Sequence, residues 1–136
     1  MNSPSKARAY APVVLRIGLA VLYLWFGFSE VTNVQMWTSY VPSWATSMSG
    51  LSVDTVVLFN GLFEIAMGTL LALGFLVRWV ALILALHMLL IVFDIGLTAI
   101  GMRDLAIATS TLALSLFGSD GLTLDCRMAV TGPAQV

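Results

Sequence analysis

Charged residues are scarce in this sequence, where aspartate, glutamate, lysine and arginine together make up only 10% of 136 residues. A soluble domain carries about a quarter of such residues. Because 60% of the chain is apolar, it lacks the polar surface that a protein of this size needs in water. A lipid bilayer removes that need. The composition therefore predicts an integral membrane protein with a single domain.

Cysteine and histidine are also scarce, with Cys126 and His87 the only examples. One cysteine cannot form an internal disulfide or a CxxC redox pair, which argues against a thiol-oxidising membrane enzyme. A single histidine without a thiolate in the apolar segments argues against a transition-metal or haem site. The net charge of -1 offers no basic field to nucleic acid. We therefore expect no metal, no covalent cofactor and no nucleic-acid partner.

Four apolar segments are each close to the roughly 20 residues that a helix needs to cross a bilayer. Lipid leaves no partner for unpaired backbone groups, and the alternation of a barrel strand is absent, so these segments are predicted to be helices. Their expected bounds are residues 12–29, 54–75, 79–100 and 104–117. Short turns after the second and third helices predict an all-α, up-down four-helix bundle. The transmembrane domain is expected at 12–118, between a segment at 1–11 and a solvated tail at 119–136.

Residues typical of helix ends mark some of these boundaries. Pro12 suits the first turn of a helix. Ser52 and Asp54 are typical of a helix cap, and Asp104 is expected to cap the fourth helix. Gly74 is expected to end the second helix.

The basic residues favour one orientation in the membrane. An up-down bundle puts one of them, Arg103, on one side and the rest on the other: Lys6, Arg8, Arg16, Arg78 and Arg127. The positive-inside rule then places both termini in the cytoplasm, which we expect to be that of a prokaryotic cell with the protein in its inner membrane.

A longer connection, residues 31–53, follows the first helix on the expected outer side. Trp37, Tyr40 and Trp44 recur in it at helical spacing, and Pro42 interrupts it. This pattern predicts an amphipathic segment at the membrane interface. It would act either as a surface anchor or as a lid over an opening in the outer leaflet.

Polar residues inside the predicted helices are expensive, at about 2.5–3.5 kcal/mol for a charge at the helix centre. Those in this chain lie between the midplane and the expected outer surface: Glu30, Asn60, Glu64, His87, Asp94, Arg103 and Asp104. Glu64 and His87 are expected near the midplane. The inner half has no comparable acidic group, so the pattern predicts a polar pocket that opens outward.

Two interpretations of these residues stay open. In the first they form a structural network, in which Arg103 pairs with Asp94 or Glu30 and Glu64 bonds to Asn60 or His87. In the second, Glu64 and His87 exchange protons or bind the polar head of an apolar ligand. The candidate site residues are Glu64, His87, Asn60, Asp94 and Arg103.

The chain also resembles the DoxX family of small four-helix membrane proteins, which includes the DoxD-like subunits of thiosulfate:quinone oxidoreductases. The likeness runs over about residues 13–117. It is carried by LRIGLA at 15–20, WFGFSE at 25–30, GLFEIAMG at 61–68, GFLVR at 74–78, WVAL at 79–82 and RDLA at 103–106. Many relatives have a basic residue where this chain has Glu30, so a positive charge at that position cannot be carried over.

The resemblance implies an accessory or quinone-interacting subunit of a membrane redox system. Glu64, with Asn60 and His87, would hold a quinone head or carry its proton, while Arg103 and Asp94 would shape the outer mouth. Because the chain has no redox centre of its own, a partner would bring electrons, and whether the chain is itself an enzyme stays open. We expect a homo-oligomer or a larger complex surrounded by lipid. The alternatives are a proton-coupled transporter with Glu64 as its coupling site and a purely structural assembly protein.

Overall fold

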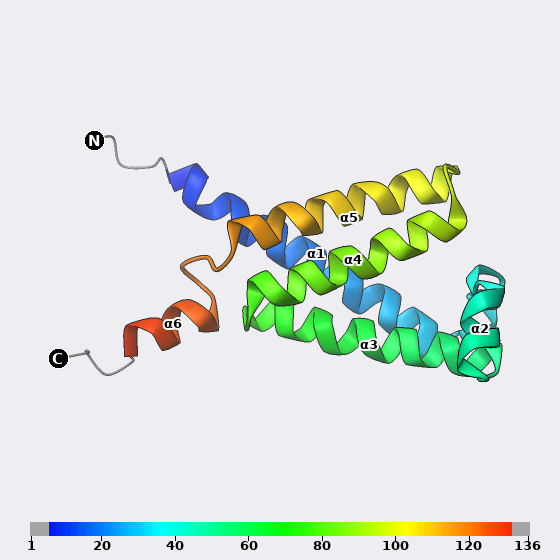
Figure 1. The fold of residues 1–136 in the computed structure, drawn as a ribbon. Helices are drawn as coiled ribbons and strands as arrows, with labels where there is room; N and C mark the ends of the chain where they lie inside the picture. Colours follow the sequence, from blue (N-terminus) through cyan, green and yellow to red (C-terminus); the bar gives the residue numbers. More distant parts are fainter. Residues whose placement is uncertain (1–5, 132–136) are drawn as a thin grey trace.

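Four long helices form the body of the protein in the computed structural model, which describes residues 6–131 (Figure 1). They are α1 (Lys6–Thr32), α3 (Val53–Leu73), α4 (Val77–Ile95) and α5 (Ala99–Phe117). Each contains a segment that is long and apolar enough to cross a membrane. The described residues form no strand. The predicted all-α membrane bundle is confirmed.

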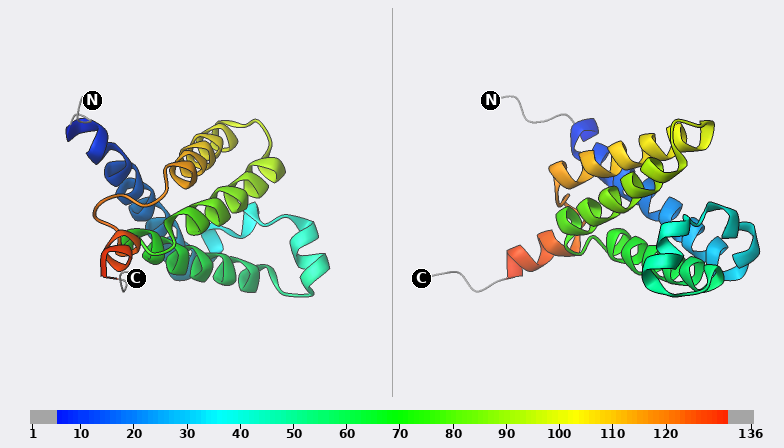
Figure 2. Two further views of the ribbon diagram at one scale, coloured as in Figure 1. Left: turned by 60° about the vertical axis from the view of Figure 1, so that its left-hand side comes forward. Right: turned by 45° about the vertical axis from the view of Figure 1, so that its right-hand side comes forward.

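The two ends of the bundle are built differently (Figures 1 and 2). One end carries the connection after α1 and the α4–α5 turn, and we call it the loop end. The other end carries the α3–α4 turn and the chain after Gly118, and we call it the tail end. Arg16 and Arg78 belong to the tail end and Arg103 to the loop end, as predicted; the side of the membrane on which each end lies stays a prediction.

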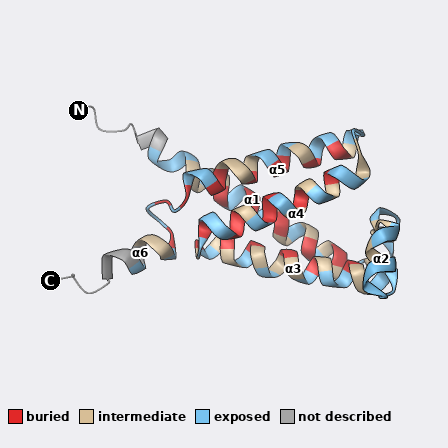
Figure 3. Cartoon of the chain, viewed as in Figure 1, coloured by how far each residue is buried: buried red, intermediate tan, exposed pale blue. Residues whose placement is uncertain are grey.

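The helices pack as two close pairs, α1 with α3 and α4 with α5, and buried residues line the space between them (Figure 3). Gly27 and Gly61 let α1 and α3 approach closely. A Cβ atom at Gly61 would lie only 2.8 Å from the carbonyl oxygen of Gly27. The buried hydroxyl of Tyr23 lies 3.0 Å from Thr111 Oγ1 and joins α1 to α5. The pairs are therefore held together by polar as well as apolar contacts.

Several predicted helix ends are confirmed and others are wrong. Ser52 caps α3, and Gly74 ends it in the left-handed conformation with φ of 71°. However, α1 begins at Lys6, so Pro12 lies inside the helix. Gly96, with φ of 73°, ends α4 at Ile95 instead of at residue 100.

The fourth long helix also begins earlier than predicted. The side chain of Thr98 accepts a hydrogen bond from the backbone N–H of Gly101 at 3.1 Å and caps α5. The helix therefore starts at Ala99. Asp104, the predicted cap, is instead a buried residue within α5.

The chain after α5 packs against the tail end, which corrects the prediction of a solvated tail. Arg16 Nε donates to Asp120 Oδ2 at 2.7 Å, and the side chains of this pair are only 2% and 1% exposed. The same guanidinium donates to the carbonyl oxygens of Leu71 and Ala72 at 2.9 and 2.7 Å. The tail end therefore does contain a buried acidic group, contrary to the prediction, and Arg16 is an internal residue.

A second aspartate of the tail caps a transmembrane helix. Asp125, in the first turn of α6 (Leu124–Thr131), accepts hydrogen bonds from the backbone N–H groups of Leu76 and Val77 at 2.8 and 3.0 Å. These are N–H groups at the start of α4, which have no partner within the helix. Thr123 is fully buried beside Gly74. The tail therefore seals this end of the bundle.

Replacing Asp120 by Asn is predicted to lower the free energy of unfolding by about 3 kcal/mol, since it leaves the buried Arg16 charge without its counter-charge. Unfolding of the purified protein by SDS in mixed micelles would measure the loss. Asp54→Asn is the control, because this exposed group at the loop end accepts a hydrogen bond from Gln35 Nε2 that an asparagine oxygen can also accept, and it should change stability by less than about 1 kcal/mol. Equal stability of the two variants would contradict the role of the ion pair.

Replacing Gly61 by Ala is predicted to cost about 1–3 kcal/mol, because the added methyl group would push α1 and α3 apart. Gly18→Ala is the matched control, since nothing lies within 4 Å of a Cβ atom there. The same unfolding measurement compares them. If both glycines tolerate alanine equally well, the close approach of α1 and α3 does not limit stability.

Candidate functional site

A cavity of about 380 Å³ lies at the loop end, between the two helix pairs. Its volume falls within the range of small-molecule sites, about 300–1,000 Å³. All four long helices contribute to its wall, together with η1 (Val34–Met36), η2 (Thr38–Tyr40) and the residues just after η2. Its polar lining residues are Glu30, Asn60, Glu64, Arg103 and Asp104. The pocket predicted from the polar residues therefore exists in the half of the bundle where it was expected.

Aromatic residues cover much of the cavity. Trp25 and Phe26 of α1 meet Trp37 and Tyr40 from the connection. The rings of Phe26 and Trp37 lie 5.6 Å apart edge to face, and Trp37 lies 5.9 Å from Tyr40. Trp37 Nε1 also donates to Ser29 Oγ at 3.2 Å. These contacts fix the connection to the end of α1.

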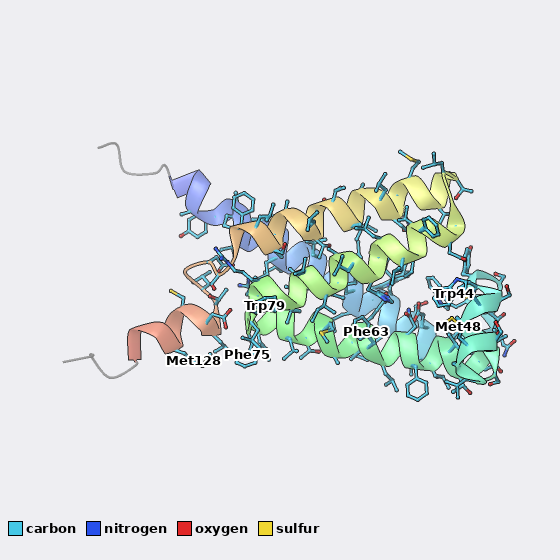
Figure 4. All side chains as sticks on the ribbon, viewed as in Figure 1. Trp44, Met48, Phe63, Phe75, Trp79 and Met128 are labelled. Carbon is cyan, nitrogen blue, oxygen red and sulfur yellow. The ribbon has the colours of Figure 1, made fainter. Side chains whose placement is uncertain are left out.

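The connection is less regular than the amphipathic segment predicted for it. It forms η1, η2 and the short helix α2 (Ser43–Ser49), and Pro42 stands at the start of α2, so the predicted interruption at Pro42 is confirmed. Trp44 does not line the cavity. Its Nε1 donates to Asp94 Oδ1 at 3.3 Å and ties α2 to α4 (Figure 4).

Glu64 is the most buried carboxyl group of the cavity, with 2% of the residue exposed. Its Oε1 lies 3.7 Å from His87 Nε2, a contact between α3 and α4 that is longer than a hydrogen bond. Its Oε2 has no hydrogen-bond partner among the described residues. Buried polar atoms are nearly always paired, so this unpaired carboxyl oxygen needs an explanation.

Glu30 and Asn60 form a pair across the close approach of α1 and α3. Asn60 Nδ2 donates to both carboxyl oxygens of Glu30, at 3.0 and 2.8 Å. Gly61 makes room for this pair, since a Cβ atom there would lie 2.9 Å from Glu30 Cβ. The hydrogen bond of Asn60 therefore goes to Glu30, whereas one of the predicted alternatives gave it to Glu64.

Arg103 and Asp104 supply the polar wall from α5. Arg103 Nε donates to Asp104 Oδ1 at 2.8 Å, and the guanidinium lies over the ring of Phe26 at 5.4 Å from its centre. This arrangement is a favourable cation–π geometry. The predicted pairing of Arg103 with Asp94 or Glu30 is wrong. Its ion pair is with Asp104, whereas Asp94 is bonded to Trp44 and Glu30 to Asn60.

The five predicted site residues thus separate into two groups. Glu64, Asn60 and Arg103 line the cavity, whereas His87 and Asp94 do not. His87 contacts Glu64 at 3.7 Å, and its side chain is 21% exposed. Its ring packs 4.9 Å from that of Phe63, which is labelled in Figure 4. Asp94 is exposed and bound to Trp44.

Sequence reasoning noted Glu30 and Asp104 as polar residues of this half but did not assign them to the site, and it missed Phe26. One signal could have found Phe26. It precedes Glu30 by four residues, so both lie on one face of α1.

The cavity can hold the polar head of a mainly apolar molecule. Its walls are largely aromatic and aliphatic, and its polar groups are three carboxyl groups, one amide and one guanidinium. Among the described residues, no three histidine, cysteine, aspartate or glutamate side chains are grouped to hold a metal ion.

Comparison with known proteins gives one match. The model of the DoxX family matches residues 11–97, more than half of the chain, from α1 through the end of α4. No curated protein and no solved structure matches the sequence.

Replacing Asn60 by Leu, which has a similar branched shape, is predicted to destabilise the protein by about 1–3 kcal/mol, because the buried Glu30 carboxyl group would lose its hydrogen bonds. Asn33→Leu, at an exposed position, is the control. The variants are compared by SDS unfolding. A stable Asn60→Leu protein would show that Glu30 does not depend on Asn60.

Proposed function

The chain belongs to the DoxX family, and we propose that it is an accessory subunit of a membrane redox system that binds a quinone headgroup in the loop-end cavity. The observation that carries the proposal is the unpaired Glu64 Oε2 in the cavity wall. A structural role alone accounts for the pairs Glu30–Asn60 and Arg103–Asp104, which are satisfied. It does not account for a buried carboxyl oxygen without a partner.

The lining residues fit the two parts of a quinone. The flat ring would lie among the aromatic and aliphatic side chains, chiefly Phe26, Trp37 and Met88. The ring oxygens need hydrogen-bond partners, and Arg103 has N–H groups beyond the one that Asp104 occupies. Glu64 Oε2 can accept a hydrogen bond from a quinol hydroxyl group or, when protonated, donate one to a quinone carbonyl group.

In this proposal Glu64 holds or moves a proton at Oε2. A quinone takes up protons as well as electrons when it is reduced, so a carboxyl group at its oxygen is chemically suited to the site. In this proposal a partner protein exchanges the electrons. We further propose an inner-membrane location in a prokaryotic cell, with both termini cytoplasmic, in a homo-oligomer or larger complex.

A proton-coupled transporter is the second candidate, and one contact favours it. Glu64 lines the cavity, and its Oε1 lies 3.7 Å from Nε2 of His87, which does not line the cavity. A residue placed in this way can exchange a proton between two surroundings. Identifying the molecule that the protein binds would distinguish the redox subunit from the transporter.

Replacing Glu64 by Gln is predicted to lower the amount of quinone that stays bound through purification at least tenfold, because the group that exchanges a proton with the ring oxygen is lost. Quinone is extracted from protein purified in lipid nanodiscs and quantified by chromatography. Asp94→Asn removes a carboxyl group of the same half that does not line the cavity, and it should retain quinone like the unmodified protein. If the unmodified protein carries no quinone after purification and binds none of the quinone that is then added, the results favour a transporter function instead.

A further inference from the structure

The cavity holds more acidic groups than basic ones. Glu30, Glu64 and Asp104 line it, and Arg103 is the only basic residue that does so among those described. Arg103 is bonded to Asp104 at 2.8 Å. Glu30 and Glu64 therefore face the cavity without a cation within it.

The groups around Glu30 and Glu64 do not offset this excess of acidic over basic groups. Asn60 gives Glu30 two hydrogen bonds but no charge. His87 contacts Glu64 at 3.7 Å from outside the cavity and leaves Oε2 free. A neutral quinone needs only one acidic hydrogen-bonding group, which Glu64 can supply, and Glu30 is already bonded to Asn60.

The aromatic wall adds an independent preference for positive charge. The faces of aromatic rings attract cations within about 6 Å of their centres. The ring of Phe26 already contacts a cation, because the guanidinium of Arg103 lies 5.4 Å from its centre. Trp25, Trp37 and Tyr40 line the same cavity, and none of them carries a cation among the described residues.

We propose that the cavity binds a lipophilic organic monocation, such as an alkylated ammonium ion, whose charge lies beside Glu64 Oε2 and Glu30 and whose apolar body lies on the aromatic wall. The bound cation would pair with the ionised form of Glu64, which is costly to leave buried without a counter-charge. This binding does not depend on the quinone proposal, although two ligands of one cavity would compete.

A metal cation fits the cavity less well. Calcium takes about six to eight oxygen ligands, and magnesium keeps a strict octahedron of oxygens. The cavity offers Glu64 Oε2 and the oxygens of Glu30 among walls that are mostly aromatic and aliphatic. An organic cation needs no such oxygen shell, because its charge is spread over alkyl groups that pack against rings.

Benzyltrimethylammonium and its uncharged isostere neopentylbenzene would test the proposal on the full chain in lipid nanodiscs. The two probes have nearly the same shape, so a difference between them reports the charge. Binding is followed by tryptophan fluorescence, since Trp25 and Trp37 line the cavity. The expected result is saturable binding of the cation, at least tenfold tighter than that of the isostere.

Two variants then locate the charge that the cation contacts. Glu64→Gln should weaken binding of benzyltrimethylammonium at least tenfold, while Asp94→Asn, whose carboxyl group does not line the cavity, should leave it unchanged. Circular dichroism and thermal unfolding establish that each variant is folded. If Glu64→Gln does not fold, the comparison of the two probes on the unmodified protein decides alone.

Three results would overturn the proposal: no saturable binding of the cation, equal affinity for the two probes, or equal loss of binding in both variants. Bound quinone that benzyltrimethylammonium displaces would support both proposals. Cation binding by a protein that retains no quinone would support this inference and reject the quinone proposal. Quinone binding without cation binding would do the reverse.

Discussion

A polar group within a membrane-spanning helix must find its partner inside the protein, because lipid offers none. This constraint accounts for most of the polar contacts of the structure. Arg16 is satisfied by Asp120 and by two carbonyl oxygens at the end of α3, and Glu30 is satisfied by Asn60. Each of these contacts joins segments that are distant in the chain, so each also fixes how the helices are arranged. Glu64 is an exception, because its Oε2 has no hydrogen-bond partner among the described residues, and this residue lines the loop-end cavity.

The two ends of the bundle meet the constraint in different ways. At the tail end, the chain after α5 folds back, so that Asp120 neutralises Arg16 and Asp125 caps α4. At the loop end, the two helix pairs leave a cavity between them, which the aromatic residues after α1 cover. Close approach of α1 and α3 at Gly27 and Gly61 positions the acidic wall of that cavity. The chain after α5 therefore packs against one end of the bundle, and the other end contains a cavity.

Much of this arrangement follows from local features of the sequence, and the errors have local causes as well. The apolar segments predicted the four long helices, and Ser52 and Gly74 predicted the two ends of α3 correctly. Asp104 was a plausible cap by residue type, yet Thr98 caps α5 because Gly96 turns the chain earlier. For the site, depth along each helix was enough to bring Glu64, Asn60 and Arg103 to one region. It could not show that Asp94 turns outward to Trp44.

The sequence by itself determined that the chain crosses a membrane four times and that its polar residues concentrate toward one end, because hydropathy and helical rise depend only on neighbours in the chain. Only the tertiary structure decided which polar groups meet. Arg16 and Asp120 are 104 residues apart, and the choice of Glu30 rather than Glu64 as the partner of Asn60 depends on how α1 crosses α3. Such choices rest on contacts of a few ångströms between helices. Those contacts left one carboxyl oxygen of Glu64 buried without a hydrogen-bond partner among the described residues.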